Sequence, residues 1–408
     1  MKRRDLIKNL ALLPVAGVTG SMLLPESVTA SPATGRPKRD LLKELGVRTF
    51  INAAGTYTFM TGCLMHDEVV EAIRSSSHDF CLLDELQDKV GEKIALLTKA
   101  ESAVVTAGCF SAMTLGLAGV LTGLDAKKAE QLPHLEGTGM KSEVIIQKGH
   151  NVGYSQALTN TGCKIVFVET IADVEKMINE NTALLWFLNI QSDKGAITHE
   201  QWVALGKKYK IPTMIDIAAD VPPVSNLWKF NEMGFDLVCI SGGKAMRGPQ
   251  STGLLMGKKD IIAAARLSMP PRGANIGRGM KVNKEEVIGM YVALEHYVNY
   301  DHEKEWKEWE GRVAVIQNAI KNINGITTEV KVPALGNVTP TLHITWDTAR
   351  VKITTKELQE KLRNGNPSIE ILGGDEAHFS MTTWSLKAHE DKIVAARLKE
   401  EFSGATSA

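Results

Sequence analysis

Asp236-Leu-Val-Cys-Ile-Ser-Gly-Gly-Lys-Ala-Met-Arg-Gly-Pro-Gln-Ser-Thr-Gly-Leu-Leu-Met256 places a lysine, Lys244, on a glycine-rich turn between two apolar runs. The runs at 237–240 and 253–256 predict buried strands, and the residues between them predict a turn. Apolar flanks on a rigid turn desolvate an amine and disfavour its ammonium form. The turn therefore indicates a lysine that can form a Schiff base near neutral pH, although a surface charge is the usual role of lysine.

Outward from this turn, strand and helix patterns alternate between residues 41 and 297, which is typical of an α/β domain with a mostly parallel sheet. Helices are expected between the strands, among them 66–75, 111–121, 171–178 and 199–208. Seven strands are expected, at 103–106, 144–147, 164–169, 183–188, 213–216, 237–241 and 252–256.

The end of the chain has a different pattern. Residues 284–323 predict one or two helices, and two strands, a helix, two strands and a helix follow up to residue 402. This order predicts a small C-terminal α+β domain. The expected organisation is a signal peptide at 1–30, a lead-in segment at 31–60, a large domain at 61–300 and the small domain at 301–408.

Composition restricts the class of protein. The 408 residues are 44% hydrophobic, enough for a large core, and the formal net charge of zero differs from the basic excess of nucleic-acid-binding proteins. The five cysteines contain no Cys-x-x-Cys pair, and His-Glu-x-x-His and related motifs are absent from the sequence. We therefore expect no nucleic-acid partner, no disulfide framework and no metal site.

The N-terminus has the features of an export signal. Adjacent Arg3 and Arg4 precede a short, broken apolar stretch at 10–24, and small residues at 28–30 suit cleavage after Ala30. The arginine pair resembles a twin-arginine signal, and the apolar stretch is too short for a stable membrane anchor. We expect an exported, periplasmic protein, with a disordered basic tail as the alternative.

An anion site is predicted after the first strand of the large domain. Thr106, Ala107, Gly108 and Cys109 form a small-residue turn that opens a helix, and Ser111 follows in its first turn. Backbone N–H groups at such a helix start bind phosphate. The turn lacks the P-loop and dinucleotide fingerprints, so ATP and NAD are not favoured.

Further polar residues follow other expected strands. His150 comes after one strand and could stack on a planar ring, and Asp216 ends another, where it could hold a pyridinium nitrogen protonated. Ser241 and Arg247 lie beside Lys244 and could contact a phosphate. Each residue alone also has an ordinary structural interpretation, as a loop histidine, a capping aspartate or a surface charge.

Together these residues resemble the fold-type I pyridoxal-phosphate (PLP) enzymes. The resemblance narrows to the family of bacterial selenocysteine synthase and its relatives, which include D-glucosaminate-6-phosphate ammonia-lyase. It extends from about residue 41 to 402. The segments that carry it are Ile51-Asn-Ala-Ala-Gly-Thr56, Lys148-Gly-His-Asn-Val-Gly-Tyr154, Ser241-Gly-Gly-Lys-Ala-Met-Arg-Gly-Pro-Gln250 and Ile276-Gly-Arg-Gly-Met-Lys-Val282.

The resemblance implies pyridoxal 5'-phosphate as the cofactor, with Lys244 as its Schiff-base lysine, Asp216 at its ring nitrogen and His150 stacked on its ring. It also implies a homodimer or larger homo-oligomer with shared active sites. The residues expected near the substrate are Asn52, Thr56, Arg247 and Arg278.

A small amino substrate is expected, because we expect an exported protein without the separate N-terminal tRNA-binding domain of selenocysteine synthase, and because the sequence has no basic excess. The interpretation is a PLP-dependent lyase that acts on an amino acid or amino-sugar acid by α,β-elimination, forming a 2-oxo acid and ammonia. Transamination, racemisation and selenium-transferase-like β-substitution use the same cofactor and remain open. An exported protein that binds a phosphorylated ligand without chemistry is the alternative from another class.

Overall fold

The computed structural model describes residues 39–406. The chain divides into two units, residues 1–49 and 50–408. The described part of the first unit contains one short helix, α1 (Leu41–Glu44). The Asp40 side chain caps this helix by accepting a hydrogen bond from the Lys43 N–H at 3.1 Å. The other elements belong to the second unit.

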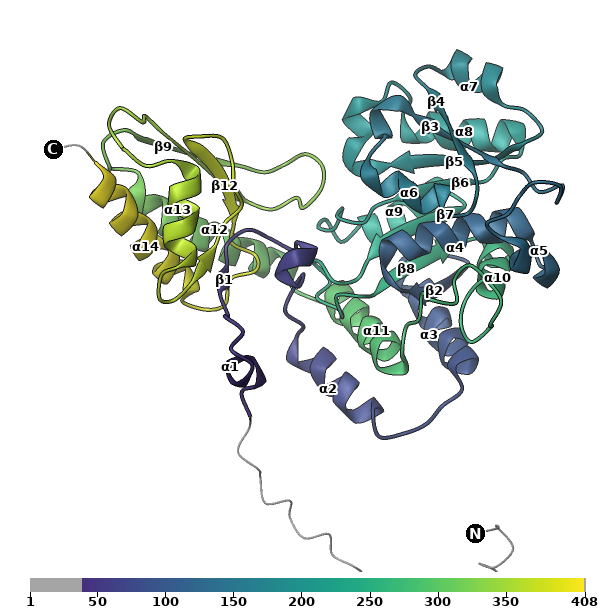
Figure 1. The fold of residues 1–408 in the computed structure, drawn as a ribbon, viewed down its shortest axis with the longest axis horizontal. Coiled ribbons are helices and arrows are strands. Elements are labelled where there is room, and N and C mark those ends of the chain that lie inside the picture. The colour runs from purple at the N-terminus through teal and green to yellow at the C-terminus, as the bar shows by residue number, and fades with distance from the viewer. Residues whose placement is uncertain (1–38, 407–408) are drawn as a thin grey trace, which may run out of the picture. The chain divides into compact units, whose positions relative to one another are not determined.

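A seven-stranded sheet forms the centre of the large domain, in the order β2-β8-β7-β6-β5-β3-β4 (Figure 1). Strand β8 is antiparallel to both of its neighbours, and the other adjacent pairs are parallel. The strands are β2 (Ser102–Thr106), β3 (Glu143–Gln147), β4 (Lys164–Val168), β5 (Thr182–Leu188), β6 (Thr213–Asp216), β7 (Leu237–Ser241) and β8 (Gly253–Gly257).

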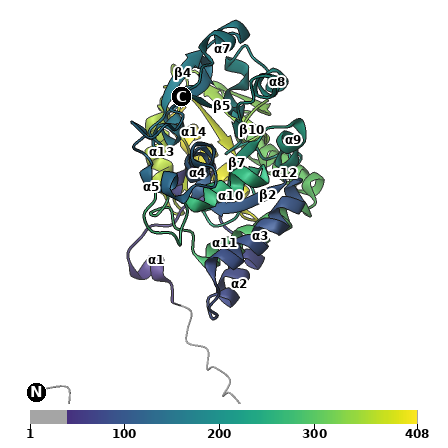
Figure 2. The same cartoon turned by 90° about the vertical axis from the view of Figure 1, so that its right-hand side faces the viewer.

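Both faces of this sheet are covered, which explains the long apolar runs. Successive residues of β5 alternate between two cores: Leu185 and Phe187 join one, and Leu184 and Trp186 join the other. The helices of the large domain are α2 (Asp67–Ser76), α3 (Leu83–Thr98), α4 (Gly108–Thr122), α5 (Ala126–Gln131), α6 (Gln156–Thr159), α7 (Ile171–Met177), α8 (His199–Tyr209), α9 (Asn226–Met233), α10 (Lys259–Leu267) and α11 (Lys284–Val298). Helices α2 and α3 both pack against α11 (Figures 1 and 2).

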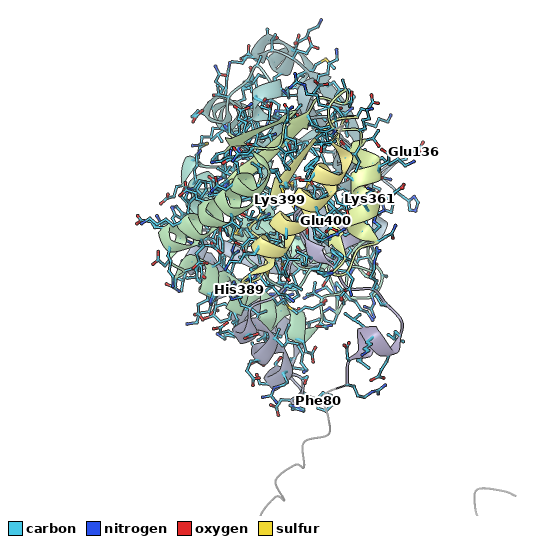
Figure 3. The ribbon with its side chains drawn as sticks, turned by 90° about the vertical axis from the view of Figure 1, so that its left-hand side faces the viewer. Phe80, Glu136, Lys361, His389, Lys399 and Glu400 are labelled. Carbon is cyan, nitrogen blue, oxygen red and sulfur yellow. The ribbon has the colours of Figure 1, made fainter. Side chains whose placement is uncertain are left out.

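The small domain packs three helices on an antiparallel sheet of order β12-β10-β9. Helix α14 contacts both α12 and α13, and Figure 3 looks onto this helical face, where Lys361, Lys399 and Glu400 are labelled. A short parallel pair, β1 with β11, adds residues from the beginning of the second unit to this domain. Its elements are β1 (Ile51–Asn52), α12 (His302–Ile320), β9 (Ile326–Lys331), β10 (Thr341–Trp346), α13 (Thr355–Arg363), β11 (Ile369–Glu370), β12 (His378–Thr382) and α14 (Glu390–Ala405).

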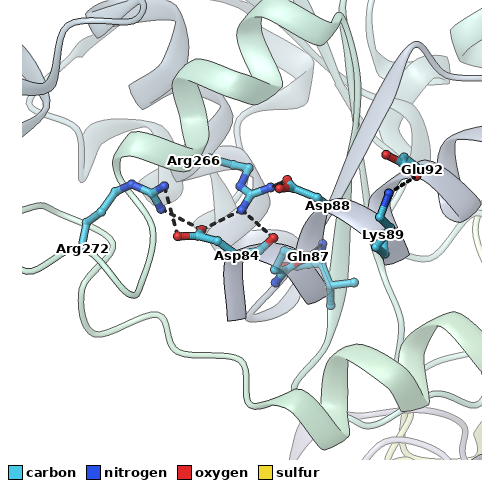
Figure 4. A network of polar contacts seen from close by, with 8 residues as sticks. Asp84, Gln87, Asp88, Lys89, Glu92, Arg266 and Arg272 are labelled. Carbon is cyan, nitrogen blue, oxygen red and sulfur yellow. Dashed lines mark hydrogen bonds and ion pairs between the residues drawn. The ribbon is translucent and has the colours of Figure 1, made fainter. Parts of the chain in front are cut away.

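An ion-pair network joins α3 to α10 and to the loop after α10 (Figure 4). The Arg266 guanidinium, 15% exposed, pairs with Asp84 at 2.7 Å and also with Asp88. Arg272, in the loop, approaches Asp84 at 3.2 Å. The Arg272 guanidinium of this loop is therefore already paired with a carboxylate of α3.

The predicted fold class is confirmed, since all seven expected strands form one mostly parallel sheet. The helical segment 284–323 is two helices, α11 and α12, separated by a short break before Asp301, which caps α12. The expected signal peptide lies outside the described residues, and the expected domain boundaries remain predictions. Among residues 39–406, no helix has both the length and the apolar character that crossing a membrane requires.

Candidate active site

The carboxyl ends of the parallel strands border a cavity of about 510 Å³, which we call the main cavity. Ligands of open α/β sheets bind at this edge. Strand β6 brings Asp216 to the cavity, and the end of β7 brings Ser241 and Lys244. The small domain contributes Thr382 and Trp384. Both domains therefore form the walls.

Helix α4 begins at the main cavity with its first backbone groups uncapped by any side chain. Gly108 has φ +81°, a left-handed conformation that suits glycine, and Gly108, Cys109 and Phe110 line the cavity. A Cβ on Gly253 of β8 would lie 2.5 Å from the Gly108 carbonyl carbon, so the strand and the turn touch through backbone. The N-terminus of a 15-residue helix in a cavity wall is suited to binding a phosphate.

Asp216 is a buried carboxylate in the same cavity. Its Oδ1 accepts a hydrogen bond from the Ala218 N–H at 2.8 Å and one from the Cys109 thiol at 3.3 Å. Burial raises the pKa of Asp216, while these two hydrogen bonds and the charge of Lys244 oppose that rise. Both hydrogen bonds fall on one oxygen, so a cationic ring nitrogen could bind the other.

Lys244 lies on a turn that backbone contacts hold closely. The Gly242 N–H donates to the Thr252 carbonyl at 2.8 Å, and the Gly248 N–H donates to the Gly242 carbonyl at 3.0 Å. A Cβ on Gly242 would lie 2.1 Å from Met290 Sδ. The sequence Gly-Gly-Lys therefore follows from packing, because side chains at the two preceding positions would displace the lysine.

A second cavity of about 240 Å³, which we call the side cavity, shares Thr56, Lys244 and Trp384 with the main cavity. Its other walls come from the turn after Lys244, from the end of α11, from α12 and from residues 385–388. Arg247 lines it and donates from Nε to the Leu64 carbonyl at 2.7 Å. Lys244 thus borders two chambers.

The structure brings most of the predicted site residues together. The main cavity contains Ala107, Gly108, Cys109, Asp216, Ser241, Lys244 and Thr56, and the side cavity contains Arg247. Thr106 and Ser111 are buried beside the α4 turn without lining either cavity. The Thr106 hydroxyl instead donates to the Gly108 carbonyl at 3.0 Å and supports the turn.

Two of the expected substrate residues lie outside both cavities. Asn52 supports two residues that line the main cavity, Ala54 and Gly55. Its Oδ1 accepts hydrogen bonds from their N–H groups, both at 3.0 Å. Arg278 is exposed on the loop after α10 and lines neither cavity. Within this chain Asn52 is therefore a positioning residue, and Arg278 does not reach the site.

The structure does not place His150 on the cavity wall, contrary to the expected stacking position. The ring is fully buried, its Nδ1 accepts a hydrogen bond from the Leu188 N–H at 3.2 Å, and it packs edge-on against Phe187 at 4.5 Å. The 3₁₀ turn Lys148–His150 directs the side chain inward. Burial lowers the pKa of His150 to about 4.

Several aromatic and polar residues of the main cavity were missed, among them Phe110, Tyr154 and Trp384. Phe110 follows the predicted phosphate turn directly, and Tyr154 lies in a segment that the sequence singled out for its histidine. Trp384 and Asn337 come from the last third of the chain, where no motif marks them. Their proximity is a product of tertiary structure.

Residues 92–341 match the sequence profile of the family described as Aminotransferase class-V. The chain belongs to this family. It is 26% identical to D-glucosaminate-6-phosphate ammonia lyase of Salmonella typhimurium strain 14028s, over 88% of this chain and 97% of that protein. It is also 26% identical to L-seryl-tRNA(Sec) selenium transferase of Clostridium botulinum strain Okra, over 84% of this chain and 80% of that protein.

A solved structure of D-glucosaminate-6-phosphate ammonia-lyase has the same fold, with a TM-score of 0.77, 25% identity, and coverage of 90% of this chain and 100% of that one. This protein is accordingly a fold-type I PLP-dependent enzyme, related to lyases and transferases, and PLP is its cofactor. The main cavity fits this cofactor. It combines an uncapped helix N-terminus for the phosphate, a buried carboxylate for the ring nitrogen and a lysine for the aldehyde carbon.

Proposed function

We propose that this protein is a PLP-dependent lyase that acts on a small amino acid or amino-sugar acid by α,β-elimination and releases a 2-oxo acid and ammonia. The observation that carries the proposal is the position of Lys244, which lines both the main and the side cavity. A base in that position can reach a substrate that extends from one chamber into the other. The similarity to an enzyme named as an ammonia lyase supports the same reaction.

Each residue of the site has a task in this reaction. The first N–H groups of α4 and the Ser241 hydroxyl bind the phosphate, and Asp216 stabilises the protonated ring nitrogen. The Lys244 amine would hold the cofactor, and as a free amine it would take the α-proton of the substrate. When bound, PLP supplies the electron sink for the bond broken at the α-carbon.

An absorption spectrum of the purified protein tests the cofactor assignment. We expect a visible band that borohydride removes and that Lys244→Ala lacks. Amino acids and amino-sugar acids are then screened for release of ammonia with formation of a 2-oxo acid, which we expect from wild type and not from Lys244→Ala. A wild-type protein that stays colourless with added PLP would contradict the assignment.

Two other reactions of the same cofactor have support in the relatives. The family profile bears the name of the aminotransferases, and the selenium transferase favours β-substitution. Transamination would form a 2-oxo acid without free ammonia, and β-substitution would need an added nucleophile. Measuring ammonia, 2-oxo acid and the fate of the amino group in one reaction mixture therefore separates the three.

We propose that the enzyme is a homo-oligomer with shared sites. Phe80, labelled in Figure 3, and Leu82 lie between α2 and α3 with exposed fractions of 104% and 73%, and a large exposed apolar side chain favours a protein contact. Arg278, remote from this chain's own cavities, would serve a neighbouring subunit. Mixing inactive Lys244→Ala with Arg278→Ala should restore part of the activity if sites are shared, whereas independent sites would leave the mixture no more active than its parts.

We propose that residues 1–30 direct export to the periplasm. The support is the sequence alone: the Arg3–Arg4 pair, the short apolar stretch and the small residues before Ala30. Cell fractionation should find mature protein beginning at Ser31 in the periplasm. The double variant Arg3→Lys/Arg4→Lys should retain the precursor in the cytoplasm, and unchanged fractionation of this variant would contradict the proposal.

A further inference from the structure

The side cavity contains polar groups that the proposed function has not yet used. Helix α12 contributes Glu305, Trp309 and Arg312, and the end of α11 contributes Tyr297. Lys244 lines the same cavity. A substrate whose α-carbon lies at Lys244 therefore has room for its β-carbon and the atoms beyond it in this chamber.

Glu305 is the acidic residue among the lining groups. Its side chain is 17% exposed, and no hydrogen bond to its carboxylate occurs among the described residues. Its carboxylate lies 3.9 Å from His302 Nδ1, and burial lowers the pKa of that imidazole. Burial raises the pKa of Glu305 to about 7, with Arg247 and Arg312 opposing the rise and Glu308 adding to it. A carboxyl group in this environment is protonated for part of the time at neutral pH, as a general acid requires.

Two hydrogen-bond donors in the same walls have no partner. The Tyr297 hydroxyl and the Trp384 indole N–H are both buried and make no hydrogen bond within the described part of the chain. Buried polar atoms in proteins are nearly always satisfied, so unpartnered donors beside a cavity indicate a ligand that carries oxygen. Trp384 also lines the main cavity, which places this donor at the junction of the two chambers.

Arg247 has a backbone conformation that residues other than glycine rarely adopt, with φ +54°. A strained backbone conformation of this kind persists only where the surrounding structure fixes it. The hydrogen bond from Nε to the Leu64 carbonyl fixes the guanidinium at the cavity, and no other hydrogen bond of its side chain is formed among residues 39–406. The remaining donors can bind a substrate carboxylate, which would orient the substrate between Lys244 and α12.

We propose that the side cavity receives the β-carbon of a 2-amino-3-hydroxy acid and that Glu305 is the acid that protonates the departing hydroxyl. This inference rests on the proposed lyase function. The Lys244 amine takes the α-proton, and the electrons of the Cα–H bond form the Cα=Cβ bond. The Cβ–O bond breaks with its electron pair on oxygen, and the proton of Glu305 completes a water molecule. Hydrolysis of the resulting enamine consumes one water, so the overall reaction yields the 2-oxo acid and ammonia without any oxidant or reductant.

The test compares leaving groups that do and do not need a proton. Glu305→Gln keeps the shape of the side chain and removes its acidic proton. The two substrates are the 2-amino-3-hydroxy acid that releases most ammonia in the screen and β-chloroalanine, whose chloride leaves unprotonated. We expect Glu305→Gln to lose about 100-fold or more in turnover of the hydroxy substrate and less than about threefold with β-chloroalanine. Glu303→Gln, an exposed position on the same helix, is the matched control and should match wild type on both.

A second measurement follows the α-proton of the substrate, which Glu305 does not transfer. Exchange of the substrate α-proton in deuterated water depends on Lys244, so Glu305→Gln should retain it while elimination of the hydroxy substrate is slow. Its absorption band should also match wild type. Equal losses with both substrates, or loss of α-proton exchange, would show that Glu305 only maintains the structure and would overturn the inference. A wild-type protein that releases ammonia from neither substrate would instead overturn the lyase function itself.

The pH profile gives a third criterion. With the hydroxy substrate, kcat/KM of wild type should fall as the pH rises through about 7, because Glu305 must be protonated, and Glu305→Gln should lack this limb. β-Chloroalanine should show no such limb in wild type. Charged and titratable groups also face or approach Glu305 from the Lys244 turn, α11, α12 and two loops. They are Lys244, Arg247, Tyr297, Tyr300, His302, Glu308, Arg312, Cys63 and Lys387. The chloride substrate controls for all of them, since they are common to both reactions.

Discussion

Substitution of Gly253 tests whether β8 positions the phosphate turn. In Gly253→Ala the new Cβ would lie 2.5 Å from the Gly108 carbonyl carbon, 2.6 Å from the Cys109 nitrogen and 2.8 Å from the Ile240 oxygen. Ordinary contact begins at 3.4 Å. All three neighbours are backbone atoms, so no side chain can rotate away. The turn that opens α4 must therefore retreat by roughly 1 Å, at an overpacking cost of ~1–3 kcal/mol.

This cost should fall mainly on cofactor binding, because the N–H groups that bind the phosphate belong to the displaced turn. At 1.4 kcal/mol for each factor of ten, PLP should bind about 5- to 150-fold more weakly. The assay is a titration of the PLP-free protein with PLP, followed by absorbance, together with thermal unfolding of the PLP-free forms. Gly273→Ala is the control, since its Cβ would meet nothing within 4 Å. If Gly253→Ala binds PLP within twofold of wild type and unfolds at the same temperature, the argument from close approach is wrong.

Three further substitutions address charge. Asp216→Asn should lower turnover by ~10²–10³-fold while the borohydride-sensitive band remains, and steady-state ammonia release that stays within threefold of wild type would contradict the role of the carboxylate. Burial in the fold lowers the pKa of His150 to about 4. The unfolded chain therefore binds more protons than the folded one between pH 6.5 and 4, and the free energy of unfolding falls as the pH falls. Urea unfolding over this range should show that His150→Asn loses up to about 3 kcal/mol less unfolding free energy than wild type. Arg266→Met removes the ion pair with Asp84 and should cost ~1–2 kcal/mol of unfolding free energy. Lys89→Met removes the exposed pair with Glu92 shown in Figure 4 and should cost less than ~0.5 kcal/mol. Equal losses in the two variants would refute the claim that the less exposed pair is the stronger one.

The central sheet could be predicted from the sequence because its strands are apolar on both faces. β5 is buried at every position, and its run of residues from Thr182 to Leu188 has few polar interruptions. The presence of Asp216 and Lys244 at one cavity could also be predicted from the sequence. Asp216 ends β6 and Lys244 follows β7, and the carboxyl ends of these parallel strands share one edge of the sheet. The two residues, 28 positions apart in the sequence, therefore lie at one cavity.

Residues that depend on local turns or on the small domain were less predictable. His150 follows a strand at the expected edge, yet a 3₁₀ turn directs its ring against Phe187 and away from the cavity. Such a turn has no clear pattern in Lys-Gly-His. Trp384 reaches the cavity because the small domain packs next to Lys244, and a single sequence does not encode that distance in any periodicity.

The pairing of β1 with β11 has a consequence for synthesis of the chain. Ile51 and Asn52 pair with Ile369 and Glu370, about 300 residues later. At ~5–20 residues per second, a ribosome needs ~15–60 s to deliver the partner of β1 after β1 itself has been made. During that time the large domain can fold, while β1 waits unpaired. Completion of the small domain is therefore a late event, and fragments that begin after residue 52 should lack a strand that their β11 requires.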